Sequence, residues 1–507
     1  MSKFILISWC LASTLGLSTI LPAQEDNTQW LSWRGPYQTG VSAEKYETWD
    51  FEGEKSIKWT LDVMGRGAPV VADGRAYSFG YAGEGPDLQV VLACIDVETG
   101  KIIWEDRVSD FISDTIYNRY GIGSPAIDPE TRNIYLMTGF GLFSCYDKDG
   151  KLLWRHSMME QFGRLTFPNG RTGAPMIEGN LVIVRGITSF WGSQGPARDR
   201  FYAFDKKTGE PVWASTPGTA PQDSSYSTPY FETRYGMRVF YSGTGCGNMV
   251  AVNALNGKPL WRFRMSKGGV NSAPVIYKDT LISPHGKENL DTSEMGRMVQ
   301  IKLPTSIDPT AEQIVIEGKE EIWRNPISAF SSSPVLHGNR VYQLNATGNL
   351  CCVDADTGKI LWQEKLAADN IHSSPLLADG IIYAPLHSGE FFVVKPSDDG
   401  AEILHRMQLE GNCFGAPSLW RGHLFVHTTK KLYCFKLKTG KISYDTVPVP
   451  EPATKGDSIG LVAVPNELLL QSGDEVSFKM NQVDAYGNVG ESVSEAEWAS
   501  WLPPTAK

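Results

Sequence analysis

The chain has 507 residues, a length that allows two to four domains or one large repeat architecture. Hydrophobic residues make up 41% and charged residues 21% of it, which excludes wholesale disorder, and a formal net charge of -10 disfavours binding to nucleic-acid phosphates. Fifty Gly, thirty Pro, fifteen Trp and nineteen Tyr favour many short strands joined by turns.

Residues 1–23 have the pattern of an export signal. Lys3 precedes a mostly apolar run over residues 4–20, and Ala23 offers a small residue at the cleavage point. The run is short for a membrane span, and no later stretch is long and apolar enough to cross a bilayer. Cys10 lacks the small residues of a lipoprotein cleavage box, so no lipid anchor is predicted. We expect a periplasmic or secreted protein without a transmembrane segment.

One phrase recurs along the chain, and each copy has two apolar stretches separated by Asp or Asn and then Gly. The first copy, residues 94–104, has the sequence CIDVETGKIIW. Further copies occupy residues 145–154, 203–213, 251–261 and 352–362, and a weaker copy occupies 434–444. The phrase predicts a strand–turn–strand hairpin, in which the glycine takes the left-handed position of the turn.

A second phrase, a small residue followed by Pro and an apolar run, occurs eight times. The intervals are 41 to 60 residues, with the prolines at Pro69, Pro125, Pro175, Pro229, Pro274, Pro334, Pro375 and Pro417. Each unit is predicted to form four antiparallel strands, as in one blade of a β-propeller. We expect an all-β fold, an eight-bladed β-propeller over residues 24–447, closed onto its last blade by an N-terminal strand around Trp59. A seven-bladed ring and a solenoid are the alternatives.

The phrase Asp-x-x-Thr-Gly-x-x-x-Trp resembles the tryptophan-docking repeat of propellers of the pyrroloquinoline quinone (PQQ) type. The opening Trp33-Arg34-Gly35-Pro36 is similar to that of exported PQQ-like propellers. This group includes quinoprotein alcohol dehydrogenases and the non-catalytic outer-membrane assembly factor BamB. The resemblance covers roughly residues 30–446 and implies the propeller fold. It does not select a function, because one fold hosts many.

The first position of the hairpin phrase is filled only by Cys or Ala. Four units place a cysteine there: Cys94, Cys145, Cys352 and Cys434. Such a position is expected to be small, buried and unbridged. The pair Cys351 and Cys352 resembles the vicinal disulfide of quinoprotein alcohol dehydrogenases, although adjacent strand residues point to opposite faces. The tryptophans that end the hairpins are expected to pack between blades, and the seventh and eighth units lack one.

The long, irregular connections are expected on one face of the ring, near the channel mouth, where propellers usually bind. Four of them, in units three to five, carry charges that suit a carboxylate, a phosphate or Ca²⁺. The candidate ligand-binding residues are Asn169, Arg171, Arg198, Asp199, His285, Lys287, Glu288, Asn289 and Asp291. The alternative is that these loops are solvated turns pinned by Arg–Asp pairs.

Other chemistry is not indicated. His372 and His387 lie in connections of the seventh unit and are interpreted as hydrogen-bonded structural residues. The sequence contains no zinc-ligand spacing, nucleophile elbow, Walker loop or dinucleotide-binding fingerprint. No cofactor and no catalytic residue are predicted. PQQ and Ca²⁺ are what the quinoprotein side of the resemblance implies.

Prolines at positions 448, 450 and 452 mark a linker over residues 448–457. Residues 458–507 contain short apolar stretches and resemble the opening of a bacterial immunoglobulin-like β-sandwich. About fifty residues is roughly half of such a domain. We therefore expect a partial immunoglobulin-like segment.

Three functional hypotheses remain. The favoured one is a monomeric, non-catalytic binding or scaffold protein of the cell envelope, similar to BamB, whose partner is a protein or an envelope ligand. The second is a PQQ-dependent dehydrogenase, disfavoured because no catalytic Asp and Ca²⁺ set is matched. The third is an envelope enzyme or polysaccharide-binding protein that uses the candidate residues of units three to five.

Overall fold

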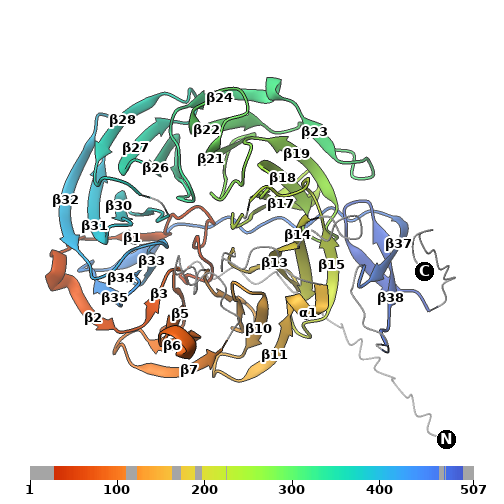
Figure 1. Cartoon of the computed structure of the whole chain (residues 1–507), viewed down its shortest axis with the longest axis horizontal. Coiled ribbons are helices and arrows are strands. Elements are labelled where there is room, and N and C mark those ends of the chain that lie inside the picture. Colours follow the sequence, from red (N-terminus) through yellow and green to blue (C-terminus); the bar gives the residue numbers. More distant parts are fainter. Residues whose placement is uncertain are drawn as a thin grey trace, which may run out of the picture.

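The computed structural model describes residues 28–109, 123–162, 173–188, 197–223, 225–370, 372–466, 473 and 475–494. Within these ranges, eight sheets of four or five strands lie around a ring (Figure 1), and we number them 1 to 8 in chain order. In each sheet the strand that follows the repeated proline lies toward the centre, and the strand at the other end of the sheet lies toward the rim.

The strands of the ring have the following bounds. Sheet 1 contains β3 (Met64–Gly65), β4 (Val70–Ala72), β5 (Arg75–Ala82), β6 (Gln89–Asp96) and β7 (Ile102–Val108), and sheet 2 contains β8 (Ala126–Ile127), β9 (Ile134–Met137), β10 (Leu142–Tyr146) and β11 (Leu152–Ser157). Sheet 3 contains β12 (Met176–Glu178), β13 (Leu181–Thr188), β14 (Arg198–Asp205) and β15 (Pro211–Ser215), and sheet 4 contains β16 (Tyr230–Arg234), β17 (Met237–Gly243), β18 (Asn248–Asn253), β19 (Pro259–Arg264) and β23 (Ile314–Ile316). Sheet 5 contains β20 (Val275–Tyr277), β21 (Thr280–Glu288), β22 (Met295–Lys302) and β24 (Glu321–Asn325), and sheet 6 contains β25 (Val335–His337), β26 (Arg340–Leu344), β27 (Asn349–Asp354) and β28 (Ile360–Lys365). Sheet 7 contains β29 (Leu376–Ala378), β30 (Ile381–Pro385), β31 (Glu390–Pro396) and β32 (Ala401–Gln408), and sheet 8 contains β33 (Ser418–Trp420), β34 (His423–His427), β35 (Leu432–Lys436) and β2 (Ile57–Leu61).

The repeated prolines mark the inner strands, as predicted. Each of the eight directly precedes the first residue of an inner strand, as Pro69 precedes Val70 of β4 and Pro417 precedes Ser418 of β33. Proline has no N–H to donate to a strand ladder, so the residue before a strand is one of the few positions in a sheet that suit it.

The two ends of the ring meet in sheet 8. Its outer strand is the N-terminal β2, which pairs antiparallel with β35 and places Trp59 opposite Cys434. This confirms the predicted closing strand. It also corrects the expectation that the eighth unit lacks a docking tryptophan: β36 (Ile442–Tyr444) does not continue the β35 hairpin but pairs with β1 (Glu44–Tyr46).

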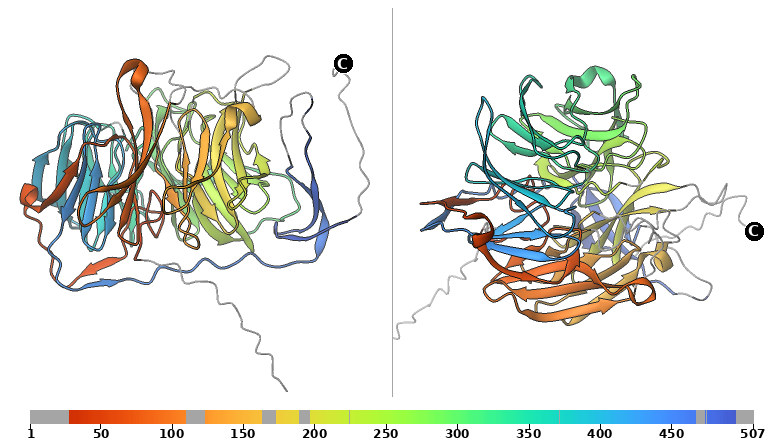
Figure 2. Two further views of the ribbon diagram at one scale, coloured as in Figure 1. Left: turned by 90° about the horizontal axis from the view of Figure 1, so that it is seen from below. Right: turned by 60° about the vertical axis from the view of Figure 1, so that its left-hand side comes forward.

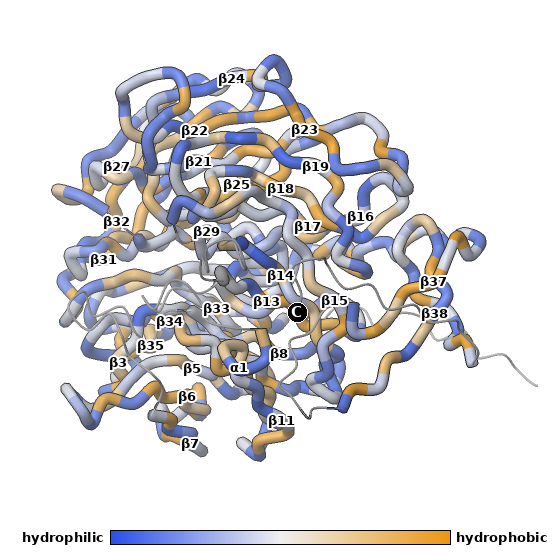
Figure 3. Tube along the Cα trace, turned by 45° about the vertical axis from the view of Figure 1, so that its right-hand side comes forward, coloured by the Kyte–Doolittle hydropathy of each residue, from blue (hydrophilic) through white to orange (hydrophobic). Residues whose placement is uncertain are grey.

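The hydrophobic core lies between neighbouring sheets, and Figure 3 shows hydrophobic stretches along the strands. Docking tryptophans fill the outer part of these layers. A Cβ atom added to Gly100 would lie 2.7 Å from the Trp59 ring, and one added to Gly150 would lie 2.7 Å from the Trp104 ring. Glycine is therefore required in these turns by the tryptophan of the preceding sheet as well as by its positive φ angle.

Residues 28–43 cross the ring at its centre and bond to the inner strands and first turns of several sheets. Trp30 forms a β-bridge with Val71 of sheet 1, and Val41 forms one with Leu377 of sheet 7. Gln29 Oε1 accepts a hydrogen bond from the N–H of Asp73, which lies in the turn after the first strand of sheet 1. This segment therefore occupies the face opposite to the long connections.

The C-terminal part forms a separate small sheet beside sheets 3 and 4, reached along the same face as residues 28–43 (Figure 2). It consists of β37 (Ser458–Val464), β38 (Lys479–Asp484) and β39 (Val489–Ser492). Asn253 Nδ2 donates to the Tyr486 carbonyl at 2.7 Å and ties it to the ring. The immunoglobulin-like assignment stays a prediction.

Helices are few and short in the described part of the chain. They are α1 (Met158–Phe162) and the 3-10 turns η1 (Gly53–Ser56), η2 (Gly85–Asp87) and η4 (Gly318–Glu320). None of these helices has the length and apolar character needed to cross a membrane.

Candidate functional site

The predicted site residues that the structure describes have separate interaction partners. Asn169 and Arg171 lie outside the described residues. Arg198 begins β14, with its Nη1 atom 3.1 Å from the Ala197 carbonyl, and Glu288 is exposed at the end of β21. The Glu288 carbonyl accepts a hydrogen bond from the N–H of Lys267 at 3.0 Å. That these residues bind a ligand stays a prediction.

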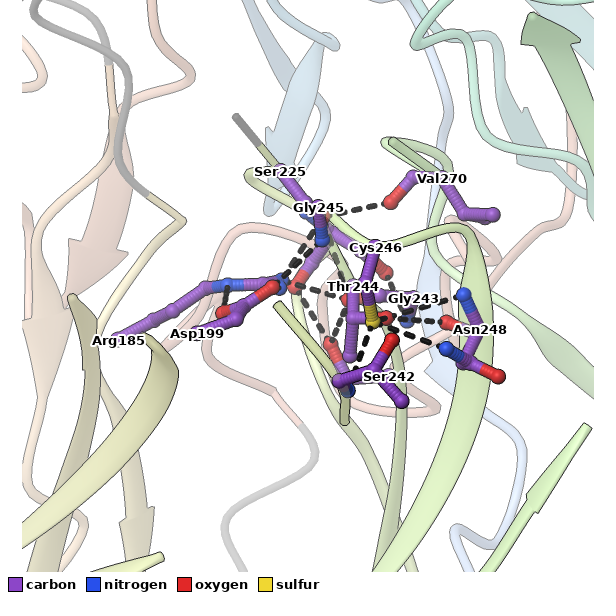
Figure 4. Close-up of polar contacts among 12 residues, drawn as sticks. Arg185, Asp199, Ser225, Ser242, Gly243, Thr244, Gly245, Cys246, Asn248 and Val270 are labelled. Atoms are coloured by element: carbon purple, nitrogen blue, oxygen red, sulfur yellow. Dashed lines mark hydrogen bonds and ion pairs between the residues drawn. The ribbon is translucent and has the colours of Figure 1, made fainter. Parts of the chain in front are cut away.

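Asp199 belongs to a buried ion pair between sheets 3 and 4 (Figure 4). Its carboxylate is fully buried and receives two bonds from Arg185, Nε to Oδ1 at 3.1 Å and Nη2 to Oδ2 at 2.6 Å. The N–H of Gly245 donates to the same Oδ2 atom. The remaining guanidinium nitrogen of Arg185 donates to Ser225 Oγ and the Gly243 carbonyl, so this pair joins two sheets.

Asn289 and Asp291 hold the connection between β21 and β22. Arg297 Nε donates to Asn289 Oδ1 at 2.8 Å, and Arg297 and Arg324 both form ion pairs with Asp291. Hydrogen bonds from these two arginines lower the pKa of Asp291. The oxygens that were predicted to suit Ca²⁺ are thus used to fix this loop.

His285 lies on β21 with no exposed surface. Burial, together with the charge of Arg297, lowers its pKa to about 4. It is therefore a neutral core residue at physiological pH.

Lys287 is the candidate residue that turns toward the centre of the ring. Its Nζ atom lies 2.6 Å from Asp223 Oδ2 and 5.0 Å from the centroid of the Phe330 ring. Phe330 in turn contacts His372 edge-on, with centroids 5.5 Å apart. Through Phe330, Lys287 therefore lies next to a different group of residues, which comes from the connections between sheets.

We call this group the mouth ring. Its members occupy one repeated position, three residues before the proline of each inner strand. In the described part of the chain they are Arg66, Tyr226, Asn271, Ser331, His372 and Phe414. The same position in sheets 2 and 3, residues 122 and 172, lies outside it. Equal register places the members at one level of the ring.

Aromatic and basic groups contact one another in one sector of the mouth ring. The Arg66 guanidinium lies 4.7 Å from the centroid of Phe414, whose ring stacks with His372 at a centroid distance of 5.2 Å. His387, from the connection between β30 and β31, meets Phe414 edge-on at 4.9 Å, and burial lowers its pKa. His372 and His387, interpreted from sequence as structural, thus lie at the centre of this group.

The polar members also reach His372. Ser331 Oγ lies 2.8 Å and Tyr226 Oη 3.5 Å from His372 Nδ1, although Tyr226 belongs to sheet 4 and His372 to sheet 7. Asn271, between Tyr226 and Ser331 in ring order, is 3% exposed, and neither its Oδ1 nor its Nδ2 atom has a hydrogen-bond partner. A buried amide without partners carries a free-energy cost unless a ligand or water satisfies it.

The next layer fixes the mouth ring. In sheets 1 and 2 the backbones touch, because a Cβ atom on Gly67 would lie 1.7 Å from the Gly123 carbonyl oxygen. In the opposite half, Ser227 Oγ donates to the Ser272 carbonyl and Ser272 Oγ to the Ser332 carbonyl, both at 2.9 Å. The connections that carry the mouth ring are thus joined to one another by backbone contact and by serine hydrogen bonds.

That the protein holds no PQQ and no Ca²⁺ stays a prediction. In the described part of the chain, no three His, Cys, Asp or Glu side chains come together as a metal site. Arg66 and His372 already contact the Phe414 ring, the central aromatic surface of the mouth. Cys351 and Cys352 are free buried thiols in two different core clusters, so the vicinal disulfide suggested by the resemblance is not formed.

Sequence reasoning missed Arg66, Tyr226, Asn271 and Phe414. Glycines lie close to three of them, as Gly65 and Gly67 flank Arg66, but no run of charged residues drew attention to these connections. The available signal was their shared distance from the repeated prolines, since equal register in every unit means equal height in the ring.

Curated relatives cover most of the ring. BamB from Burkholderia pseudomallei is 24% identical over 394 residues, which is 74% of this chain and 87% of that protein. BamB from Yersinia pestis is 23% identical, covering 56% of this chain and 67% of that protein. Tetrathionate hydrolase from Acidithiobacillus ferrooxidans is 24% identical, over 54% of this chain and 63% of that enzyme.

Solved structures support the propeller fold. BamB from Moraxella catarrhalis aligns with a TM-score of 0.51 and 13% identity over 78% of this chain and 99% of its own. Quinohemoprotein alcohol dehydrogenase from Comamonas testosteroni aligns with a TM-score of 0.56 and 14% identity, over 86% and 83% of the two chains. The model of the family described as outer membrane protein assembly factor BamB matches residues 89–294, 305–401 and 332–446. The repeats, the ring of antiparallel sheets and this match over more than half of the sequence lead to one conclusion: the chain belongs to the BamB family of PQQ-like β-propellers.

Proposed function

We propose that the chain is an exported, non-catalytic propeller of eight blades that binds a protein of the cell envelope through its mouth ring. Membership of the BamB family supports a scaffold role, and the export signal predicted from residues 1–23 agrees with it. The protein acts as a monomer and without PQQ. Tetrathionate hydrolase names the activity of that relative, and we do not assign this activity to the present chain.

One observation carries the proposal: the mouth ring gathers groups suited to binding. Arginine, phenylalanine and histidine stack on one another there, and such groups are enriched where proteins hold their partners. In the described part of the mouth, the Asp223 carboxylate forms an ion pair with Lys287. This ion pair differs from the two titratable groups with separated pKa values that act as general acid and general base in enzymes.

The test is capture of partners from an envelope extract, with each captured protein identified by mass spectrometry. Arg66→Gln and Phe414→Ala should each remove the partner without lowering the melting temperature by more than a few degrees. Arg406→Gln is the matched control, because Arg406 also lies over a phenylalanine, Phe392 at 5.5 Å, but on an outer strand. A partner retained by the mouth variants, or lost equally with Arg406→Gln, contradicts the proposal.

A quinoprotein dehydrogenase is the second candidate, supported by the fold likeness to the Comamonas enzyme. Addition of PQQ and Ca²⁺ should change neither the melting temperature nor the absorbance spectrum of the cofactor if the scaffold proposal holds. A stabilisation by several degrees with dye reduction in the presence of an alcohol would favour the dehydrogenase. The earlier hypothesis of a polysaccharide site in units three to five stays a prediction.

A further inference from the structure

The sector of the mouth formed by sheets 4 to 6 has the properties of a peptide site. Asn271 provides the main evidence for such a site. Its amide is almost completely buried, and neither polar atom has a hydrogen-bond partner among the described residues. An amide side chain offers N–H donors and a carbonyl acceptor in one plane, the same kinds of group that a peptide unit offers. It can therefore satisfy one backbone N–H and one backbone C=O of an extended segment at once.

The protein already uses this arrangement elsewhere. Gln38, in the segment that crosses the opposite face, donates from Nε2 to the Phe231 carbonyl at 3.2 Å and accepts from the Phe231 N–H at 2.9 Å. One side-chain amide thus satisfies both backbone groups of a strand residue. Asn271 presents the same two atoms with nothing in the described chain to occupy them.

Lys287 supplies the second element of the site. Lys287 lies on β21, close to the connection that carries Asn271, since its side chain packs against Gly268, three residues before Asn271. Its ammonium is paired with Asp223 at 2.6 Å, and the two side chains are 24% and 25% exposed. The pair is only partly exposed, but a carboxylate from outside that takes the place of Asp223 exchanges one ion pair of Lys287 for another, so the ammonium stays paired.

We propose that this sector binds an extended acidic segment of a partner protein, with Asn271 pairing to one peptide unit and Lys287 to a carboxylate in place of Asp223. The inference rests on the proposed function and specifies the chemistry of its partner. A carboxylate is favoured over other anions because Asp223, itself a carboxylate, already fits the ammonium group. Asp223 acts as an internal competitor for the same position.

The test is titration of the full mature chain with a dye-labelled, capped peptide, Gly-Asp-Gly-Asp-Gly, followed by fluorescence anisotropy. The peptide in which Asn replaces both Asp residues is the matched probe. Lys287→Met should weaken binding of the Asp peptide by about tenfold or more and leave the Asn peptide unchanged, since one charged hydrogen bond is lost. Asp223→Asn should tighten binding of the Asp peptide by about tenfold, because the competitor is removed.

Asn271→Ala should weaken both peptides, and Asn271→Ser replaces it if the alanine variant loses cooperative melting. Lys319→Met is the control, because Lys319 is also ion-paired but lies on an exposed turn. Equal affinity for the two peptides, no binding of either, or weaker binding in Asp223→Asn overturns the proposal. So does displacement of the peptide by equimolar phosphate, which would indicate a general anion site.

The two proposals fail separately. If envelope partners depend on Arg66 and Phe414 but the Asp peptide does not bind, the peptide chemistry is wrong and the scaffold role stands. If the peptide follows the expected signs but no envelope protein depends on the mouth, the site exists and the scaffold role is wrong.

Discussion

At the scale of single residues, the cysteine positions follow from the packing of the outer hairpins. Each lies directly opposite a docking tryptophan in the strand register. The pairs are Cys94 with Trp104, Cys145 with Trp154, Cys352 with Trp362 and Cys434 with Trp59, and alanine fills the same place as Ala203 opposite Trp213 and Ala251 opposite Trp261. All four cysteines are buried and free, which confirms the prediction of an unbridged packing position.

Replacement of Cys94 by Ala should therefore cost about 1 kcal/mol or less of unfolding free energy, since alanine already fits this slot in two other sheets. Urea denaturation at neutral pH measures the difference. A loss of about 3 kcal/mol or more is usual for the truncation of a large core side chain. A loss of that size for Cys94→Ala would mean that the thiol does more than fill space.

Replacement of Asp199 and replacement of Asp291 should reduce the free energy of unfolding by different amounts, although arginine binds each of these predicted site residues. Asp199→Asn leaves Arg185 charged and buried, so we expect a loss of about 3–5 kcal/mol. Asp291→Asn acts on a side chain that is 48% exposed and should cost much less. Parallel urea titrations compare the two, and equal losses would contradict this distinction.

At the scale of elements, β2 is the strand on which ring closure depends. The Trp59 indole covers Gly100 of sheet 1, and its Nε1 atom donates to the Val97 carbonyl at 2.8 Å. Trp59→Ala should cost about 3–5 kcal/mol and expose the N-terminal segment to protease digestion. Trp104→Ala, in the equivalent position between sheets 1 and 2, should cost a similar amount without that local digestion. Similar digestion in both variants would show that closure has no special role.

The repeats allowed most of this architecture to be predicted, because each strand start has a local signal in the prolines and the Gly turns. They gave no signal for β23, which joins sheet 4 by parallel pairing with β19 from within a long connection of sheet 5. Pairing of this kind depends on which edge lies nearby after folding. The mouth ring was not predicted for a related reason: its members are far apart in sequence and meet only in the folded ring.

The charged loops were misleading in another way. Asp291 and Asp199 were chosen for their carboxylates, yet the arginines that bind them lie on strands of the same sheet. A sequence shows that charges are present, but which charges form pairs is set by the register of neighbouring strands.

At the scale of the whole molecule, three buried histidines make the ring sensitive to acid. His285, His423 and His427 are at most 3% exposed, and burial is the main reason that the pKa of each falls to about 4. Unfolded histidine has a pKa of about 6.5, so the unfolded chain binds these protons first as the pH decreases. The stabilisation from neutral histidine is fully present above pH 6.5 and is lost as the pH falls toward 4.

His427 allows this prediction to be tested at one residue. Its Nε2 atom lies 2.9 Å from the Val63 carbonyl and its Nδ1 atom 3.3 Å from Ser78 Oγ, so His427→Gln keeps a polar group at the site. The wild-type chain should lose several kcal/mol between pH 6.5 and 4.5, on the order of 1.4 kcal/mol per pH unit for each proton taken up. In His427→Gln this slope should decrease by about one proton, whereas the slope above pH 7 should stay unchanged. Carboxylates with lowered pKa values, such as Asp291, lose their contribution only at still lower pH. Burial raises the pKa of Glu44, so the difference between the wild type and His427→Gln, in which other groups cancel, is the quantity to compare. An unchanged slope in the variant would mean that His427 takes up its proton in the folded ring as readily as in the unfolded chain.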